Sequence, residues 1–120
     1  MGYMRHHAIV VTGLDFTNIG LGNAVRKAQR EAKRLFSGVA TVSAITPRGT
    51  NGYQSFLVAP DGSTEGWPTS DRGDAARSEF IQFLNSMRHE DMSSPLDWVE
   101  VQYGDADGVT KIVRHSDEDR

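Results

Sequence analysis

The sequence predicts one α+β domain over residues 1–120, a two-layer fold in which two helices pack on one face of a mostly antiparallel sheet. The chain has 120 residues, of which 38% are hydrophobic, and this suits a single packed core. Two stretches repeat apolar residues at helical spacing, and six short stretches with strand patterns surround them. Their order, βαβββαββ, lacks the strict alternation of parallel α/β folds, so two layers are the simplest arrangement.

The first strand and the first helix follow each other near the N-terminus. Residues 7–12, HAIVVT, form an apolar, β-branched run that predicts a central strand buried on both faces. An apolar stripe at three-to-four spacing then predicts a helix that ends at Gly38, with Thr17 or Asn18 as its N-cap. Two glycines weaken the first turn of this helix and favour a start nearer Asn23.

Three strands are then predicted to form a meander. Residues 39–46 and 52–59 flank the pair Asn51-Gly52, which is a strong hairpin signal, so we expect them to pair antiparallel. A Pro-Asp-Gly turn follows, and we expect it to send residues 64–67 back as a short third strand.

The second helix is predicted to begin after Pro68 and to end near His89. Asp71 and Asp74 are three residues apart and resemble a capping box at its start. The apolar face repeats at helical spacing, which predicts that it faces the core. Its members are Ala76, Phe80, Phe83, Leu84 and Met87.

Residues 96–103 and 109–114 are predicted to form a C-terminal hairpin around a DADG turn. Residues 116–120, SDEDR, form a charged tail that we expect to fray. One chain leaves the sheet face away from the helices without a cover. We therefore expect a second subunit to lie there, which predicts a homo-oligomer.

Charge and composition narrow the classes of partner. The net charge of −3 opposes binding along a nucleic acid polymer, because such binding depends on many basic contacts to phosphate. The absence of cysteine excludes disulfides and thiolate chemistry. No stretch is long and apolar enough for a secretory or membrane-spanning segment. We therefore expect a cytoplasmic protein without membrane partners, in which any anionic ligand is held locally.

The first predicted helix carries a row of basic side chains. Arginines at positions 26, 30 and 34 are four residues apart, so they share one line along the helix and repel one another. Such a row fits a solvated helix face, a phosphate site or the docking of an acidic protein, and the sequence leaves all three open. The five basic residues, of thirteen in the chain, are Arg26, Lys27, Arg30, Lys33 and Arg34.

The stretch from Asn51 to Arg77 combines aromatic side chains with hydrogen-bond donors. Aromatic faces stack on bases, while hydroxyls, arginines and free N–H groups at a helix start hold phosphate oxygens. Strand alternation sends about half of these aromatics into the core, so structural roles compete with ligand binding. The candidate ligand-binding residues are Arg26, Arg30, Tyr53, Ser55, Trp67, Ser70 and Arg77, with Ser63, Thr69 and Arg72 as further donors nearby.

The sequence contains no catalytic or metal-binding motif. The histidines at positions 6, 7, 89 and 115 are not at the spacing of a helical zinc pair, and no nucleophile elbow or phosphate-binding loop is found. Gly20-Leu21-Gly22 lacks the third glycine of a dinucleotide fingerprint. We therefore expect no enzyme activity, no cofactor and no metal.

Three segments resemble a class of small proteins encoded in bacteriophage genomes: NGYQSFLVAPDGSTEGWPTSDRGDAARSEF, SPLDWVEVQYGD and HHAIVVT. The chain is similar to the anti-CBASS sponge family, phage proteins that sequester cyclic dinucleotide immune signals. The resemblance implies an oligomeric, non-enzymatic binder of 3′,3′-linked cyclic dinucleotides. Such a protein protects a phage in the host cytoplasm from the CBASS defence. The resemblance assigns no individual binding residue.

The leading hypothesis is therefore an immune-evasion protein that binds and sequesters a cyclic dinucleotide without cleaving it. Tyr53 or Trp67 would stack on a base. Arg26, Arg30 and Arg77 would balance the phosphates, in a cleft completed by a second subunit. The alternative is a small inhibitor or adaptor that presents the basic helix face to an acidic host protein.

Overall fold

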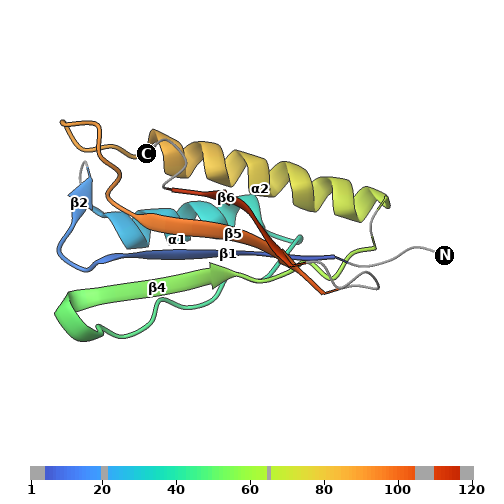
Figure 1. Cartoon of the computed structure of the whole chain (residues 1–120), viewed down its shortest axis with the longest axis horizontal. Coiled ribbons are helices and arrows are strands. Elements are labelled where there is room, and N and C mark those ends of the chain that lie inside the picture. The colour runs from blue at the N-terminus through green and yellow to red at the C-terminus, as the bar shows by residue number, and fades with distance from the viewer. Residues whose placement is uncertain (1–4, 20–21, 65, 105–109, 117–120) are drawn as a thin grey trace.

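The computed structural model describes residues 5–19, 22–64, 66–104 and 110–116, and it has a two-layer α+β fold (Figure 1). The two helices are α1 (Ala24–Leu35) and α2 (Pro68–Ser86), and both pack on the same face of one antiparallel sheet. The fold class predicted from the sequence is confirmed. The sheet has the order β4-β1-β5-β6, with β1 (His6–Leu14), β4 (Tyr53–Val58), β5 (Asp97–Tyr103) and β6 (Lys111–His115).

β1 lies in the middle of the sheet, as predicted, but only one of its faces is buried. Ile9 and Val11 are fully buried on the helix side. Val10 points to the other face, where it is 38% exposed and pairs with Leu57 of β4 and Val99 of β5. The prediction that both faces are buried is wrong, because both helices cover the same side. We call the uncovered side the open face.

The core lies between the sheet and the two helices. Phe80 of α2 is fully buried, and its ring centroid lies 5.9 Å from that of Phe36 and 6.5 Å from that of Phe56 on β4. These three rings connect the end of α1, the middle of α2 and the sheet. Small side chains let α1 lie close against the same core: Ala24, Val25, Ala28 and Ala32 are all fully buried.

α1 begins at Ala24, which agrees with the predicted start near Asn23. Asn23 is the N-cap, and its side chain accepts a hydrogen bond of 3.1 Å from the Arg26 N–H. The earlier cap candidates, Thr17 and Asn18, are wrong. The chain before α1 instead forms a two-residue ladder, β2 (Asn18–Ile19) with β3 (Gly22–Asn23), which uses the backbone groups that an earlier helix start would need.

The predicted three-stranded meander does not form. Residues 39–46 run antiparallel beside β4, as predicted, with one isolated bridge at Val42. Three backbone hydrogen bonds also join them, donated by the N–H groups of Ser43, Thr46 and Ala59. Hydroxyl groups replace part of the regular ladder: Ser43 Oγ and Thr46 Oγ1 accept backbone N–H groups of β4 at 2.9 and 3.0 Å. The segment therefore covers the outer edge of β4 without becoming a regular strand.

The two turns on either side of β4 have different outcomes. Asn51 and Gly52, the predicted hairpin signal, both adopt positive φ, 61° and 81°, and they form part of η1 (Thr50–Gly52). Residues 64, 66 and 67 form no strand. The Trp67 N–H donates to the Thr64 carbonyl at 3.2 Å, and this turn leads directly into α2.

α2 starts at Pro68, before the predicted cap at Asp71, and ends at Ser86, slightly before the predicted end at His89. The predicted capping box is wrong, because the N-cap residue Trp67 makes no side-chain cap hydrogen bond and Asp74 accepts one of 2.6 Å from Arg77 instead. Proline at the first helical position needs no partner for a backbone N–H. The helix therefore starts without a side-chain cap.

β5 and β6 form the predicted C-terminal hairpin, with a bulge between Glu100 and Val101. The predicted DADG turn and residues 117–120 of the tail lie outside the described residues. Ser116 is anchored rather than frayed, because its N–H donates to the Trp98 carbonyl at 3.0 Å and its hydroxyl accepts the Trp98 N–H at 3.2 Å. Among the described residues, no helix is long and apolar enough to cross a membrane.

Candidate functional site

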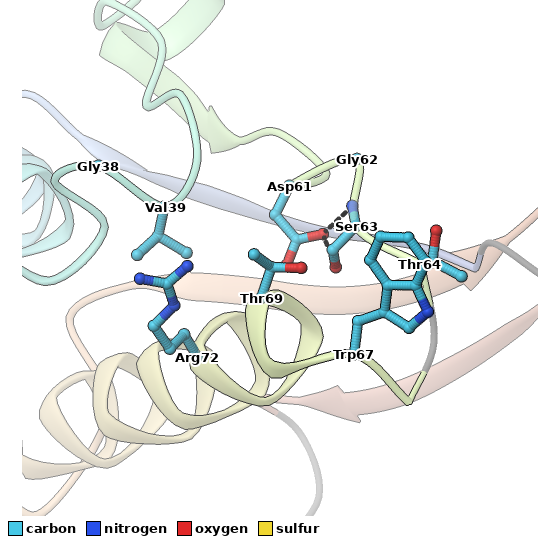
Figure 2. Close-up of a pocket in the computed structure, with 9 residues that line it drawn as sticks. All are labelled: Gly38, Val39, Asp61, Gly62, Ser63, Thr64, Trp67, Thr69 and Arg72. Atoms are coloured by element: carbon cyan, nitrogen blue, oxygen red, sulfur yellow. Dashed lines mark hydrogen bonds between the residues drawn. The ribbon is translucent and has the colours of Figure 1, made fainter. Parts of the chain in front are cut away.

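A hollow of about 390 Å³ lies where the start of α2 meets the loop before it and the end of α1 (Figure 2). We call it the α2 pocket. In Figure 2, Trp67 and Arg72 extend from α2 on either side of Asp61 and Thr69. The lining residues are Gly38, Val39, Asp61, Gly62, Ser63, Thr64, Trp67, Thr69 and Arg72.

Trp67 presents an aromatic face at the rim of this pocket. It occupies the N-cap position of α2, where the following proline fixes the entry of the helix, and it is 59% exposed. Figure 2 places its indole beside Thr64. By contrast, Trp98 is buried in the core. Because burial of an indole is normally favourable, an exposed one beside hydroxyl groups offers a surface for stacking.

Asp61 forms the floor of the α2 pocket. Its Oδ1 accepts the Ser63 N–H at 2.9 Å and the Ser63 hydroxyl at 2.7 Å, and its Oδ2 lies 3.4 Å from Arg77 Nη1. Burial is the largest single influence and raises the pKa of Asp61. The Ser63 hydrogen bonds and the Arg77 charge together outweigh burial, so the pKa is lowered and the carboxylate is ionised at neutral pH.

Arg77 lies beneath the pocket rather than on its surface. Its side chain is 4% exposed, and its Nη2 donates to Asp74 at 2.6 Å. Its Nε lies 4.0 Å from Glu100 on β5. Three carboxylates therefore surround this guanidinium, counting Asp61. Arg77 acts on the pocket by holding Asp61 in place, and it does not face a ligand.

Gly73 allows the Asp61 carboxylate to lie against α2. A Cβ atom at this position would stand 1.9 Å from Asp61 Oδ2, which is far inside any normal contact. From the sequence, Asp61 is expected only as part of the Pro-Asp-Gly turn. A glycine in the middle of a helical pattern was the available signal, since it indicates a close approach by another group.

The structure separates the other predicted site residues. Ser70 is 3% exposed, and its side chain is buried beneath the first turn of α2. Tyr53 and Ser55 lie on the open face of the sheet, where Ser55 Oγ is 2.8 Å from Thr12 Oγ1. Neither β4 residue lines the α2 pocket.

The two predicted phosphate ligands of α1 line a different hollow. Arg26 and Arg30 border a cavity of about 440 Å³ at the N-terminal end of α1, which we call the α1 pocket. Gly38 and Val39 of the α2 pocket follow the opposite end of the same helix. Of the seven candidate ligand-binding residues, Trp67 lines the α2 pocket, together with the further donors Ser63, Thr69 and Arg72.

No protein-family model, curated protein or solved structure matches this chain.

The α2 pocket is equipped for binding. Ser63 donates its hydroxyl to Asp61, but a carboxylate with a lowered pKa is a weak base at neutral pH. No histidine lines the pocket. Over the described ranges, no group of three or more His, Asp or Glu side chains is arranged to hold a metal ion. The lining residues can stack on an aromatic ring, donate hydrogen bonds and supply the positive charge of Arg72.

Proposed function

We propose that this chain binds a cyclic dinucleotide in the α2 pocket and sequesters it without cleaving it, as a phage immune-evasion protein would. One observation carries the proposal: the indole of Trp67 is 59% exposed at the rim of a hollow that also contains hydroxyl donors and Arg72. Stacking of a base on an aromatic side chain contributes about 1–3 kcal/mol and tolerates any base.

The charges in the pocket favour one orientation of the nucleotide. Asp61 repels a phosphate from the floor, although Arg77 partly neutralises it. Arg72 lies at the opposite side from Trp67 and offers a guanidinium for a phosphate. Asp61 Oδ2 has one hydrogen-bond partner at 3.4 Å, so it retains capacity for a donor. We therefore infer that a base edge with N–H groups faces Asp61.

The size of the pocket limits how much of the ligand one chain can enclose. Its volume of about 390 Å³ lies near the lower end of the range for ligand sites, which is about 300–1,000 Å³. We infer that one chain encloses one nucleotide unit of the cyclic ligand and leaves the other unit at the mouth of the pocket.

The open face supports the proposal of a homo-oligomer. Val10, Leu57 and Ile112 are 38%, 41% and 61% exposed on it, and they come from three different strands. Thr12 and Ser55 hydrogen bond to each other at 2.8 Å, so their hydroxyls have a partner if the face is covered. An apolar centre with a polar rim is the usual composition of a protein interface.

Calorimetric titration of the purified protein with a panel of cyclic dinucleotides tests the proposed ligand. We expect binding by the wild-type protein and quenching of the exposed Trp67 fluorescence, since Trp98 is buried. The Trp67→Ala variant is expected to bind about 10- to 100-fold more weakly, because stacking is lost. Intact nucleotide recovered after denaturing the complex would separate sequestration from hydrolysis.

Tyr53→Ala is the matched control. Tyr53 is also a half-exposed aromatic residue, at 44%, but it lies on β4 away from the α2 pocket. Its removal is expected to leave the affinity within about twofold of the wild-type value, because small surface changes outside a site have little effect. An absence of heat across the panel at high micromolar protein, or equal losses in both variants, contradicts the proposal.

A further inference from the structure

The N-terminal end of α1 carries positive charge where a helix normally carries negative charge. Arg26 and Lys27 lie in its first turn, which contains no acidic residue. The N-terminus of a helix is the positive end of its dipole, so cations there raise the free energy of the folded state. Arg30 adds a like charge one turn further along the same line as Arg26. The arrangement is unfavourable unless an anion lies nearby.

The chain itself does not supply that anion within the described residues. The only glutamate in α1, Glu31, is paired with Arg34. Across residues 5–19, 22–64, 66–104 and 110–116, the ion pairs that form do not include Arg26 or Arg30. Although the net charge of the protein is −3, no carboxylate of the described residues pairs with either arginine.

These two arginines border a hollow with a fixed wall. The α1 pocket has a volume of about 440 Å³ and is also lined by Gly22, Asn23, Gln29 and Ile45. Gln29 Nε2 donates to the Ser43 carbonyl at 3.0 Å, which ties the helix to the segment that forms the opposite wall.

We propose that the α1 pocket is an oxyanion site in which Arg26 and Arg30 bind a phosphate group. Guanidinium groups donate paired hydrogen bonds that match the geometry of phosphate oxygens. A phosphate group suits this site better than an acidic peptide, because both guanidinium groups border one hollow and a single multiply charged group can contact both. The site is separate from the α2 pocket, since the twelve residues of α1 set the two about 18 Å apart along the helix axis.

Thermal unfolding in sodium pyrophosphate, compared with sodium chloride at the same ionic strength, tests this site. The wild-type melting temperature is expected to rise by about 4 °C when pyrophosphate is well above its dissociation constant. The double variant Arg26→Gln, Arg30→Gln is expected to lose most of this rise. Inorganic phosphate and a nucleoside monophosphate, tested in the same way, distinguish a free phosphate ion from a phosphorylated ligand.

The matched control is Lys33→Gln, Arg34→Gln, which removes the same charge from the last turn of α1. This control is expected to keep the pyrophosphate shift. Without added anion, the two double variants should shift the melting temperature in opposite directions. Loss of Arg26 and Arg30 raises the melting temperature, because like charges leave the positive end of the dipole. Loss of Lys33 and Arg34 lowers it, because favourable charges leave the negative end.

Equal pyrophosphate shifts in wild type and both double variants would overturn the proposal, since they would reflect a general salt effect. A shift with oligoglutamate but none with pyrophosphate would also overturn it, in favour of an acidic protein partner. The Trp67→Ala variant is expected to keep the pyrophosphate shift in full. The Trp67→Ala variant therefore tests the oxyanion proposal separately from the proposal of a nucleotide site in the α2 pocket.

Discussion

Gly73 shows how a single residue connects the α2 pocket with the packing beneath it. Glycine in the interior of a helix is less favourable than alanine by about 1 kcal/mol. Here the absent side chain leaves room for the Asp61 carboxylate, which in turn reaches Arg77. The position of the pocket floor thus depends on a backbone position that contacts no ligand.

Replacing Gly73 with alanine is expected to reverse the usual effect of this substitution in a helix. An added Cβ 1.9 Å from Asp61 Oδ2 must displace the carboxylate, so we expect a loss of about 1–3 kcal/mol in the free energy of unfolding. Urea denaturation measures it. Ala75→Gly, at an exposed position of α2, is the control and is expected to lose about 1 kcal/mol through helix propensity alone. A Gly73→Ala protein as stable as the wild type would contradict the proposed contact.

At the scale of secondary structure, the sequence predicts the long periodic elements well. α2 has an apolar repeat that includes Phe80 and Leu84, and both are buried as expected. Residues 39–46 have a strand-like composition too, but Ser43 and Thr46 bond to β4 through their hydroxyls. Composition does not distinguish a hydroxyl that bonds to the neighbouring backbone from one that faces solvent, so the irregular edge was not predictable.

The candidate site was predictable only in part, because the sequence does not show which of its side chains are buried. Trp67 stands next to Pro68 in a run of donors, which made it a candidate from the sequence. The structure, not the sequence, places it at the start of α2, because residues 64–67 were predicted as a strand. The sequence does not reveal which arginine is buried. Arg72 and Arg77 lie in the same helix, yet Arg72 lines the pocket and Arg77 is 4% exposed among carboxylates. That difference depends on Glu100, which comes from a distant strand.

A buried charge cluster joins three strands to α2. Glu100 of β5 is 2% exposed, its Oε1 lies 2.6 Å from Arg114 Nε on β6, and its Oε2 lies 3.6 Å from His7 Nδ1 on β1. Arg77 of α2 lies at 4.0 Å. Burial is the largest influence and raises the pKa of Glu100, but the hydrogen bonds and charges of His7 and Arg114 together lower it.

This cluster predicts a loss of stability in acid. A carboxylate whose pKa is lowered by folding stabilises the folded state above its unfolded pKa, and that stabilisation disappears as the pH falls through the folded pKa. Glu100 and Asp61 both have lowered values, relative to 4.5 and 3.8. We therefore expect the free energy of unfolding, measured with urea, to be constant near neutral pH and to fall below about pH 4.5.

The Glu100→Gln variant measures what the Glu100 carboxylate contributes to the free energy of unfolding and to its pH dependence. The variant leaves buried Arg77 and part-buried Arg114 without its charge, so we expect a loss of about 3 kcal/mol at neutral pH. The remaining dependence on pH below 4.5 should also be shallower than in the wild type. Glu79→Gln, at an exposed position of α2, is the control and should leave both quantities nearly unchanged. Parallel pH profiles for Glu100→Gln and wild type would contradict this role.

At the scale of the whole molecule, the two faces of the sheet differ in exposure, because both helices cover the same face. Both helices cover the side that carries Ile9, Phe56 and Trp98, which are buried. The open face carries exposed aliphatic residues at the centre and no covering element among the described residues. Exposed apolar patches on soluble proteins commonly mark protein interfaces. The face also has a hollow of about 360 Å³ beside Ile112, so it presents a projection and a recess together.

A face with a projection beside a recess can pair with a copy of itself, because a two-fold axis places each projection in the other recess. Ile112 is the most exposed of these aliphatic residues, at 61%, and Ile112→Asp puts a charge within the proposed contact. Sedimentation velocity is expected to show wild-type dimers that the variant converts to monomers. Met92→Asp is the matched control, because Met92 is 71% exposed in the loop between α2 and β5. A wild-type protein that stays monomeric at high micromolar concentration, or a dimer that both variants leave intact, would rule out this face as the interface.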